Sequence, residues 1–284
     1  MMTLVGFIVV TVCVFGGFML EGGHMAVLFQ PIELLIIGGS ALGSLIAACS
    51  THLLKEIMAS IAEAFKGPVI SQEKYLQLVK LIFELFKLAA GNPLAIEQHV
   101  DNPHQSAIFS KYPLIMHDHH AVDFIANTLL LHLSASIAPH DLDDLLDTDI
   151  KTLHEAELMI PKTISRVGDA LPGLGIVAAV LGVVITMGKL TQGKEVIGHS
   201  VAAALVGTFL GILLSYGFAQ PLSAKIETNI EDKGKVLHVI KIAILAFARG
   251  CNAKVCAEFA RRSIPDEFRP SWKDLDKAIA TVKS

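Results

Sequence analysis

The sequence predicts an all-α membrane protein. We expect four transmembrane helices in two hairpins, a large helical cytoplasmic loop between the hairpins, and a helical cytoplasmic C-terminal extension. The chain has 284 residues, 52% of them apolar, and its mean hydropathy of +0.57 is too high for an ordinary soluble domain. The apolar excess lies in four runs, and the polar stretches show helical rather than alternating periodicity. A net charge of -4 gives no reason to expect a nucleic-acid partner.

Two of the apolar runs, Leu171–Gly188 and Ser200–Ala219, contain no Asp, Glu, Lys, Arg or His. About 20 residues at a rise of about 1.5 Å each cross the roughly 30 Å hydrocarbon core of a bilayer. A short link with two lysines joins the runs, so they predict a transmembrane hairpin. Pro172 and Pro221 bracket this hairpin. Because proline stops or bends a helix beyond its first turn, we expect them to mark the cytoplasmic edges.

Small residues form a stripe along each helix of this hairpin. They recur at intervals of three and four, which places them on one helical face. Such stripes let helix backbones approach closely in lipid. We interpret them as helix-packing surfaces, formed by Gly175, Ala178, Ala179 and Gly182 on the first helix and by Ser200, Ala204, Gly207, Gly211 and Ser215 on the second, with Thr208 beside them.

The other two apolar runs predict an N-terminal hairpin with helices at Thr3–Leu20 and Leu34–Cys49. No basic region or cleavage site accompanies the first run, which argues against a signal peptide. Pro31 opens the second helix, and Glu33 stands in the first turn, where the helix dipole favours a carboxylate. A functional role for Glu33 is the alternative, but we expect a helix-start carboxylate at the membrane interface. We also expect a small packing face made by Ser40, Gly43, Ser44 and Ala47.

The basic residues predict the orientation. Of 23 Lys and Arg residues, only Lys189 and Lys194 lie in the links after the first and third helices. Because basic residues near membrane edges mark the cytoplasmic side, we predict a multi-pass inner-membrane protein with both termini in the cytoplasm. The predicted segments are 1–51 with the first two transmembrane helices, 52–165 as a cytoplasmic helical domain, 166–222 with the last two transmembrane helices, and 223–284 as a cytoplasmic helix and tail.

Within the cytoplasmic segments, the periodicity predicts a helix capped by Ser71, another at about Ala121–Ile137, a third after Pro139, and a helical continuation beyond Pro221. The run His117-Asp118-His119-His120 has metal-binding composition, but adjacent positions rarely converge on one ion, so we predict no metal site. We interpret the acidic cluster Asp141, Asp143, Asp144, Asp147 and Asp149 as a solvated face that could meet a basic partner, and the four cysteines as apolar fillers rather than disulfides.

None of the four predicted spans contains a carboxylate, although intramembrane carboxylates normally mark proton relays. A translocated ion would therefore need an acid from a partner, and this chain alone is predicted not to conduct ions. No nucleophilic constellation lies in the membrane, so we predict no enzyme and no cofactor.

Four motifs together resemble the MotA family of flagellar motor stator proteins: VFGGFMLEGG, QPIELLIIGGSALGS, GDALPGLGIVAAVLGVV and ALVGTFLGILLSYGFAQPL. The resemblance covers nearly the whole chain, with the motifs in the family's order. It implies a homo-oligomer, a pentamer around two copies of MotB, whose single membrane helix supplies the missing aspartate. Ion flow at that aspartate would turn the pentamer against the rotor protein FliG, giving flagellar rotation, motility and chemotaxis.

The resemblance also implies roles for individual residues. The family's two prolines correspond to Pro172 and Pro221, its fourth-helix threonine to Thr208, and its rotor-contacting glutamate to Glu97. The family's rotor-side arginine falls on Ala89, and Lys87 stands two positions away. We expect Glu97 and the neighbouring lysines Lys74, Lys80 and Lys87 to meet the rotor.

The same resemblance bears on the transported ion. Sodium must exchange its water for several oxygen ligands, whereas a proton needs one carboxylate and a water path. Sodium-driven relatives carry a second threonine on the third helix, and the matching position here is Ala179. We therefore expect H⁺ rather than Na⁺.

The sequence is also compatible with two other functions. One is a proton-driven energiser like ExbB or TolQ, although that family typically has three membrane helices rather than four. The other, from a different class, is a metal transporter or sensor that uses the His-rich loop, and it predicts that replacing His117, His119 and His120 together abolishes function.

Overall fold

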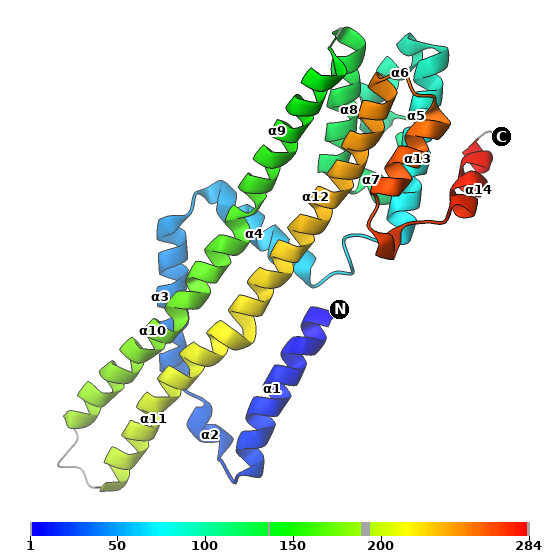
Figure 1. Cartoon of the computed structure of the whole chain (residues 1–284). Helices are drawn as coiled ribbons and strands as arrows, with labels where there is room; N and C mark the ends of the chain where they lie inside the picture. The colour runs from blue at the N-terminus through cyan, green and yellow to red at the C-terminus, as the bar shows by residue number, and fades with distance from the viewer. Residues whose placement is uncertain (1, 136, 189–193, 283–284) are drawn as a thin grey trace. The chain divides into compact units, whose positions relative to one another are not determined.

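The protein is described by a computed structural model that covers residues 2–135, 137–188 and 194–282. All regular structure in these ranges is helical (Figure 1). The chain divides into two compact units, residues 1–67 with 156–229, and residues 68–155 with 230–284. The first unit includes 52–67, 156–165 and 223–229 in addition to the predicted transmembrane segments.

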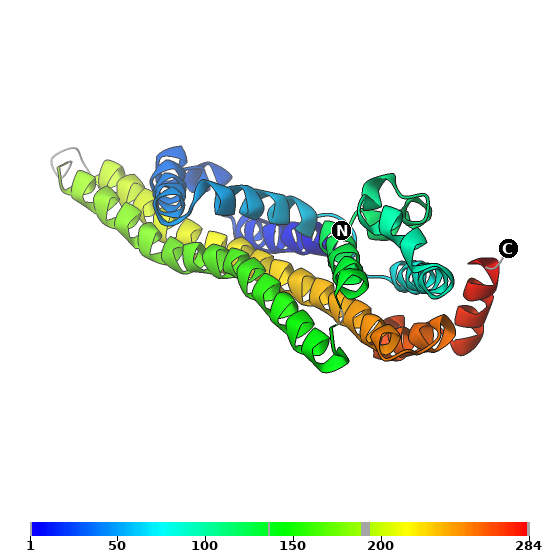
Figure 2. The same ribbon diagram turned by 90° about the horizontal axis from the view of Figure 1, so that it is seen from above.

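The first unit contains the predicted hairpins. The third and fourth membrane helices run side by side as a long antiparallel pair in both views (Figures 1 and 2). Its elements are α1 (Met2–Leu20), α2 (Met25–Leu28), α3 (Pro31–Ala48), α4 (Thr51–Ala64), α10 (Met159–Met187), α11 (Lys194–Ile212), the π-helix η4 (Leu213–Ala219) and the first part of α12 (Gln220–Ala248).

Within the described residues, four helical stretches are long and apolar enough to cross a membrane, as the sequence predicts. Their outward faces carry large apolar side chains, such as Leu35 and Ile176, which are exposed. Large apolar side chains exposed along whole helices indicate contact with lipid or with other chains rather than with water.

Both prolines lie inside continuous helix, so the expected helix end at Pro172 is absent, and the predicted helical continuation beyond Pro221 is confirmed. Pro172 is within the 29 residues of α10. Pro221 is the second residue of α12, after η4 and Gln220, and the backbone N–H of Gln220 bonds to the carbonyl of Ser215, five residues back. Proline removes a backbone donor, but neighbouring helices and a local π turn can absorb the defect, so the helix continues.

The second unit has a helical core built around α5 (Gln72–Gly91), whose buried side chains include Tyr75 and Phe86. Ser71 caps α5 by accepting a hydrogen bond from the Lys74 N–H, as its sequence position predicts. The Phe86 ring stacks on Phe247 with 4.4 Å between centroids. The remaining elements are α6 (Pro93–Val100), η1 (Pro103–Gln105), η2 (Phe109–Lys111), α7 (Pro113–Met116), α8 (His119–Ser134), α9 (Pro139–Glu157), the rest of α12, α13 (Ala253–Ser263), η5 (Asp266–Phe268) and α14 (Trp272–Val282).

Candidate ion-path site in the membrane helices

Helices α10 and α11 approach so closely that their backbones touch. A Cβ atom added to Gly175 would lie 2.8 Å from the carbonyl oxygen of Gly207, and one on Gly211 would lie 2.6 Å from that of Leu171. Real Cβ contacts are essentially never this short, and the clashing atoms are backbone. Only glycine fits at these positions.

Ala179 and Thr208, the two positions on which the expected choice of ion depends, lie at this contact. A Cβ on Gly207, the residue before Thr208, would lie 3.4 Å from the backbone nitrogen of Ala179. The Cα of Thr208 is 3.3 Å from the Cβ position of Gly175. Ala179 and Thr208 are both half-buried, so these two positions adjoin the same contact between α10 and α11.

Glu33 is buried, which corrects its expected place as a solvated interface residue. Its residue exposure is 8%, and its Oε2 atom has no hydrogen-bond partner among the described residues. A Cβ on Gly207 would lie 2.9 Å from Oε2, and a Cβ on Gly182 would lie 3.6 Å from Oε1. The carboxyl group therefore occupies the space that two glycines of the α10 and α11 stripes leave open.

The sequence contains a signal for this placement. Glu33, Ile37 and Ala41 are spaced by four, and these three are the buried residues of α3. The small face expected at Ser40, Gly43, Ser44 and Ala47 is exposed within the chain. None of the four predicted spans contains a carboxylate, but Glu33 directly precedes the second of them. Although the Glu33 backbone precedes the uncharged run, its side chain reaches glycines that lie within the other two spans.

A polar cluster joins α10 to the start of α12 close to the two prolines. The Gln220 amide nitrogen donates to the Asp169 carboxylate at 2.7 Å and to the Ser165 carbonyl at 3.2 Å. The Ser165 hydroxyl donates to the Gln220 amide oxygen at 3.1 Å, and the Ser223 hydroxyl donates to the Pro161 carbonyl at 2.7 Å. These hydrogen bonds connect the two helices where proline removes backbone donors. Composition and spacing gave no indication of this cluster.

The predicted rotor-contacting residues lie in the second unit and differ in exposure. Glu97 on α6 and Lys87 on α5 are exposed, whereas Ala89, at the family's arginine position, is 5% exposed. Lys74 is also buried, and its ammonium lies 2.8 Å from the Asp118 carboxylate. Lys74 is therefore structural, and its expected place on the rotor face is wrong.

The histidine and aspartate clusters of the sequence hold structural interactions. Asp118 caps α8 by accepting from the Ala121 N–H. Asp143 and Asp147 of α9 lie 2.5 and 2.6 Å from the buried ammonium of Lys241, so part of the expected solvated face is engaged within the chain. Among the described residues, no group of three metal-ligating side chains comes together, and the four cysteines are free.

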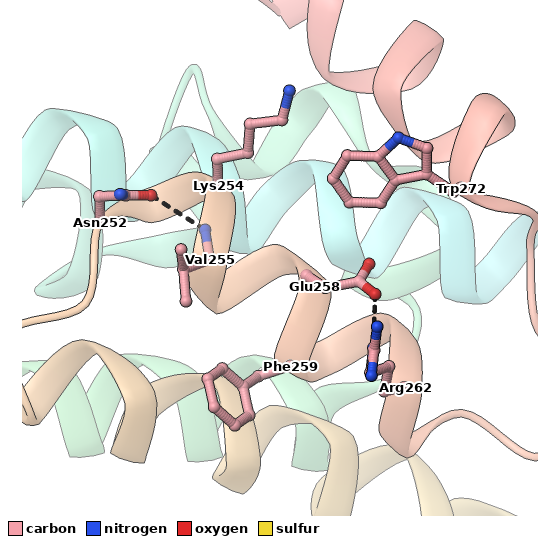
Figure 3. A pocket seen from close by; sticks show the side chains of 7 residues that line it. All are labelled: Asn252, Lys254, Val255, Glu258, Phe259, Arg262 and Trp272. Atoms are coloured by element: carbon pink, nitrogen blue, oxygen red, sulfur yellow. Dashed lines mark hydrogen bonds and ion pairs between the residues drawn. The ribbon is translucent and has the colours of Figure 1, made fainter.

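A surface hollow of about 430 Å³ lies between α13 and α14 in the second unit (Figure 3). Its charged groups are paired, because Lys254 contacts Asp276 at 2.6 Å and Glu258 binds Arg261 and Arg262. Hydrogen bonding to Arg261, which outweighs the opposing effect of burial, lowers the pKa of Glu258. The residues that line the hollow are Asn252, Lys254, Val255, Glu258, Phe259, Arg262 and Trp272.

Comparison with known proteins identifies the family. The model "Motility protein A N-terminal" matches residues 4–92, and "MotA/TolQ/ExbB proton channel family" matches residues 117–238. Motility protein A of Salmonella typhimurium is 35% identical over 286 residues, covering 100% of this chain and 97% of the relative. The chain belongs to the motility protein A family. Chemotaxis protein LafT of Vibrio parahaemolyticus is similar at 34% identity, with 99% of each chain covered.

Two solved structures share this fold. "Structure of C. jejuni MotAB" has a TM-score of 0.77 at 19% identity and covers 95% of this chain and 98% of the other. The flagellar MotAB stator complex from Bacillus subtilis has a TM-score of 0.73 at 20% identity, covering 94% and 96%. Together with the family models, these matches confirm the predicted family, the all-α membrane fold and the prediction that the chain is not an enzyme. The chain is a multi-pass protein of the inner membrane.

Proposed function

We propose that this chain is the stator subunit of a bacterial flagellar motor and couples ion flow to rotation. The observation that carries the proposal is the glycine-mediated contact of α10 and α11, with Ala179 and Thr208 beside it, in a chain of the motility protein A family. Helices this close, with one hydroxyl position and exposed apolar flanks, suit a wall of an ion path that other chains complete.

The remaining wall and the central acid come from other chains in this proposal. Several copies, five by family resemblance, surround a MotB-type partner whose single membrane helix carries the ion-binding aspartate. The exposed apolar faces of the first unit support such contacts. Both termini and the second unit lie in the cytoplasm, in line with the distribution of Lys and Arg.

The transported ion in this proposal is H⁺. A sodium ion needs several oxygen ligands, and Ala179 brings none to the place where it adjoins Gly207 and Thr208. The matching family model, which describes a proton channel family, supports the same choice.

Torque passes to a FliG-type rotor protein through charges of the second unit. Glu97 and Lys87, both exposed and of opposite sign, are the contacts we propose. A single exposed pair contributes little, but a ring of copies repeats it and complementary charge fixes register.

The test is rotation in stator-deficient cells supplied with this chain and its MotB-type partner. We expect tethered cells to rotate when both are present and to stop when either is absent. Speed should stay constant when sodium is removed at constant proton motive force. No rotation from the pair would contradict the stator function, whereas rotation that stops without sodium would contradict only the choice of ion.

A further inference from the structure

The Glu33 carboxyl group lies between three membrane helices, and one of its oxygens has no partner among the described residues. Glu33 is 8% exposed, and its Oε2 lacks a partner among the described residues. It faces Gly182 of α10 and Gly207 of α11. Here the small-residue stripes leave room for a side chain from α3, in addition to letting α10 and α11 approach each other.

The described stretches packed around Glu33 carry no charge that could balance an ionised carboxylate. The packed stretches 171–188 of α10 and 200–219 of α11 contain no Asp, Glu, Lys, Arg or His. The four residues of α2 and the rest of α3 carry no charged side chain either. An ionised carboxylate is strongly disfavoured in such a place, so the group is stable only when it binds a cation or is protonated.

The site suits a proton better than a metal cation. Hard cations need several oxygen ligands, and the glycine and alanine side chains beside Glu33 supply none. The nearest hydroxyl along α10, that of Thr186, donates to the Gly182 carbonyl at 2.8 Å. One free carboxylate oxygen is enough to hold a proton.

The position of Glu33 along the helices indicates the side from which a proton would arrive. Glu33 lies in the first turn of α3, and Gly182 lies nearer the Met187 end of α10 than Pro172 does. With both termini in the cytoplasm, these two helix ends face the outer side of the membrane. Gly207, which adjoins Ala179, connects this carboxyl group to the proposed ion path.

We propose that Glu33 is a second proton-binding group of the ion path, on the outer side of the partner's aspartate. Its carboxylate takes a proton from water at the outer side, becomes neutral, and releases that proton through water to the partner's ionised carboxylate, which regenerates the Glu33 carboxylate. The inference rests on the proposed stator function and adds a residue of this chain to its proton route.

The experiment uses the full chain with its MotB-type partner in stator-deficient cells. The variants are Glu33→Gln, which removes the acid, and Glu33→Asp, which keeps it. Glu21→Gln is the matched control, because Glu21 is an exposed carboxylate in the link on the same predicted side. The readouts are proton flux into membrane vesicles, rotation speed against external pH, and co-purification of the partner.

We expect Glu33→Gln to lower proton flux about tenfold or more while the partner still co-purifies, since a positioned acid contributes at least this much to proton transfer. Glu33→Asp should retain most of the flux and shift the external pH at half-maximal speed. Glu21→Gln should match the unmutated chain.

Unchanged flux and pH profile in Glu33→Gln would overturn the inference while leaving the stator function intact. Equal loss in Glu33→Gln and Glu33→Asp would also overturn it, because the acid would then not be the determinant. No flux or rotation from the unmutated pair would overturn the proposed function, and this inference with it.

Discussion

The two units of the chain differ in how their buried charges are paired and in where their large apolar side chains lie. In the second unit the buried ammonium groups of Lys74 and Lys241 each face a carboxylate, and a continuous apolar core surrounds α5. In the first unit the Oε2 atom of buried Glu33 has no hydrogen-bond partner among the described residues, and large apolar side chains cover the outside. The second unit pairs its buried ammonium groups within the chain, whereas the first leaves apolar faces and one acid for lipid, other chains or an ion.

This difference indicates which forces hold each unit. Apolar burial from water stabilises the second unit, and removing one member of its ion pairs leaves a costly unpaired charge. In lipid the hydrophobic effect does not drive helices together, so close packing of small residues must hold the first unit. The predictions below separate these two cases, from the largest expected effect to the smallest.

Replacing Gly211 by valine should abolish rotation. Any Cβ there meets the Leu171 carbonyl oxygen at 2.6 Å and the Gly175 Cα at 3.0 Å, so α10 and α11 would have to separate. Swimming in soft agar and co-purification with the MotB-type partner measure the effect.

The matched control for this variant is Gly43→Val on α3, where an added Cβ meets nothing within 4 Å in the chain. A Gly211→Val protein that rotates like the control would show that the glycine contact does not hold the first unit together.

Lys74→Met should lower the free energy of unfolding of the second unit by about 3 kcal/mol, because it leaves Asp118 buried without its cation. The double variant Lys74→Met with Asp118→Asn should recover much of this loss, since asparagine still caps α8 and carries no charge. Fluorescence of the single tryptophan, Trp272 on α14, reports this unit during denaturation. Additive effects of the two substitutions would contradict the pairing.

Glu97→Lys should reduce torque only partly, because an exposed ion pair contributes about 1 kcal/mol or less. Charge reversal at the facing position of the FliG-type rotor should restore part of the torque. Glu155→Lys, an exposed reversal on α9 of the same unit, serves as the control. If bead-assay torque is the same for Glu97→Lys and this control, the rotor contact lies elsewhere.

The membrane helices could be predicted because their evidence is local. Uncharged runs of sufficient length and the Ser71 cap depend on residues next to each other in sequence, and the structure contains both features. The small stripes also follow helical periodicity, so their buried members could be named before the structure was known.

The place of Glu33 could not be read from α3 alone. Its position in a first turn fits a solvated carboxylate equally well, and only the approach of Gly182 and Gly207 from distant parts of the chain decides between the two. The burial of Lys74 could not be predicted for the same reason, because its partner Asp118 is 44 residues away in the sequence. Pro172 was misjudged for a different reason. Its intrinsic effect on a helix was judged correctly, but neighbouring helices, through contacts such as the hydrogen bond from Gln220 to Asp169, let α10 continue past it.

The uninterrupted course of α10 and α12 past these prolines has a mechanical consequence. A helix resists stretching along its whole length, because each residue adds about 1.5 Å and hydrogen bonds fix that rise. Where a proline removes a bond from the ladder, resistance to bending falls while the length stays fixed. Pro172 and Pro221 therefore make two stiff rods, α10 and the continuous helix of η4 and α12, with one compliant joint each. Each rod can change direction but transmits a push with little loss of length.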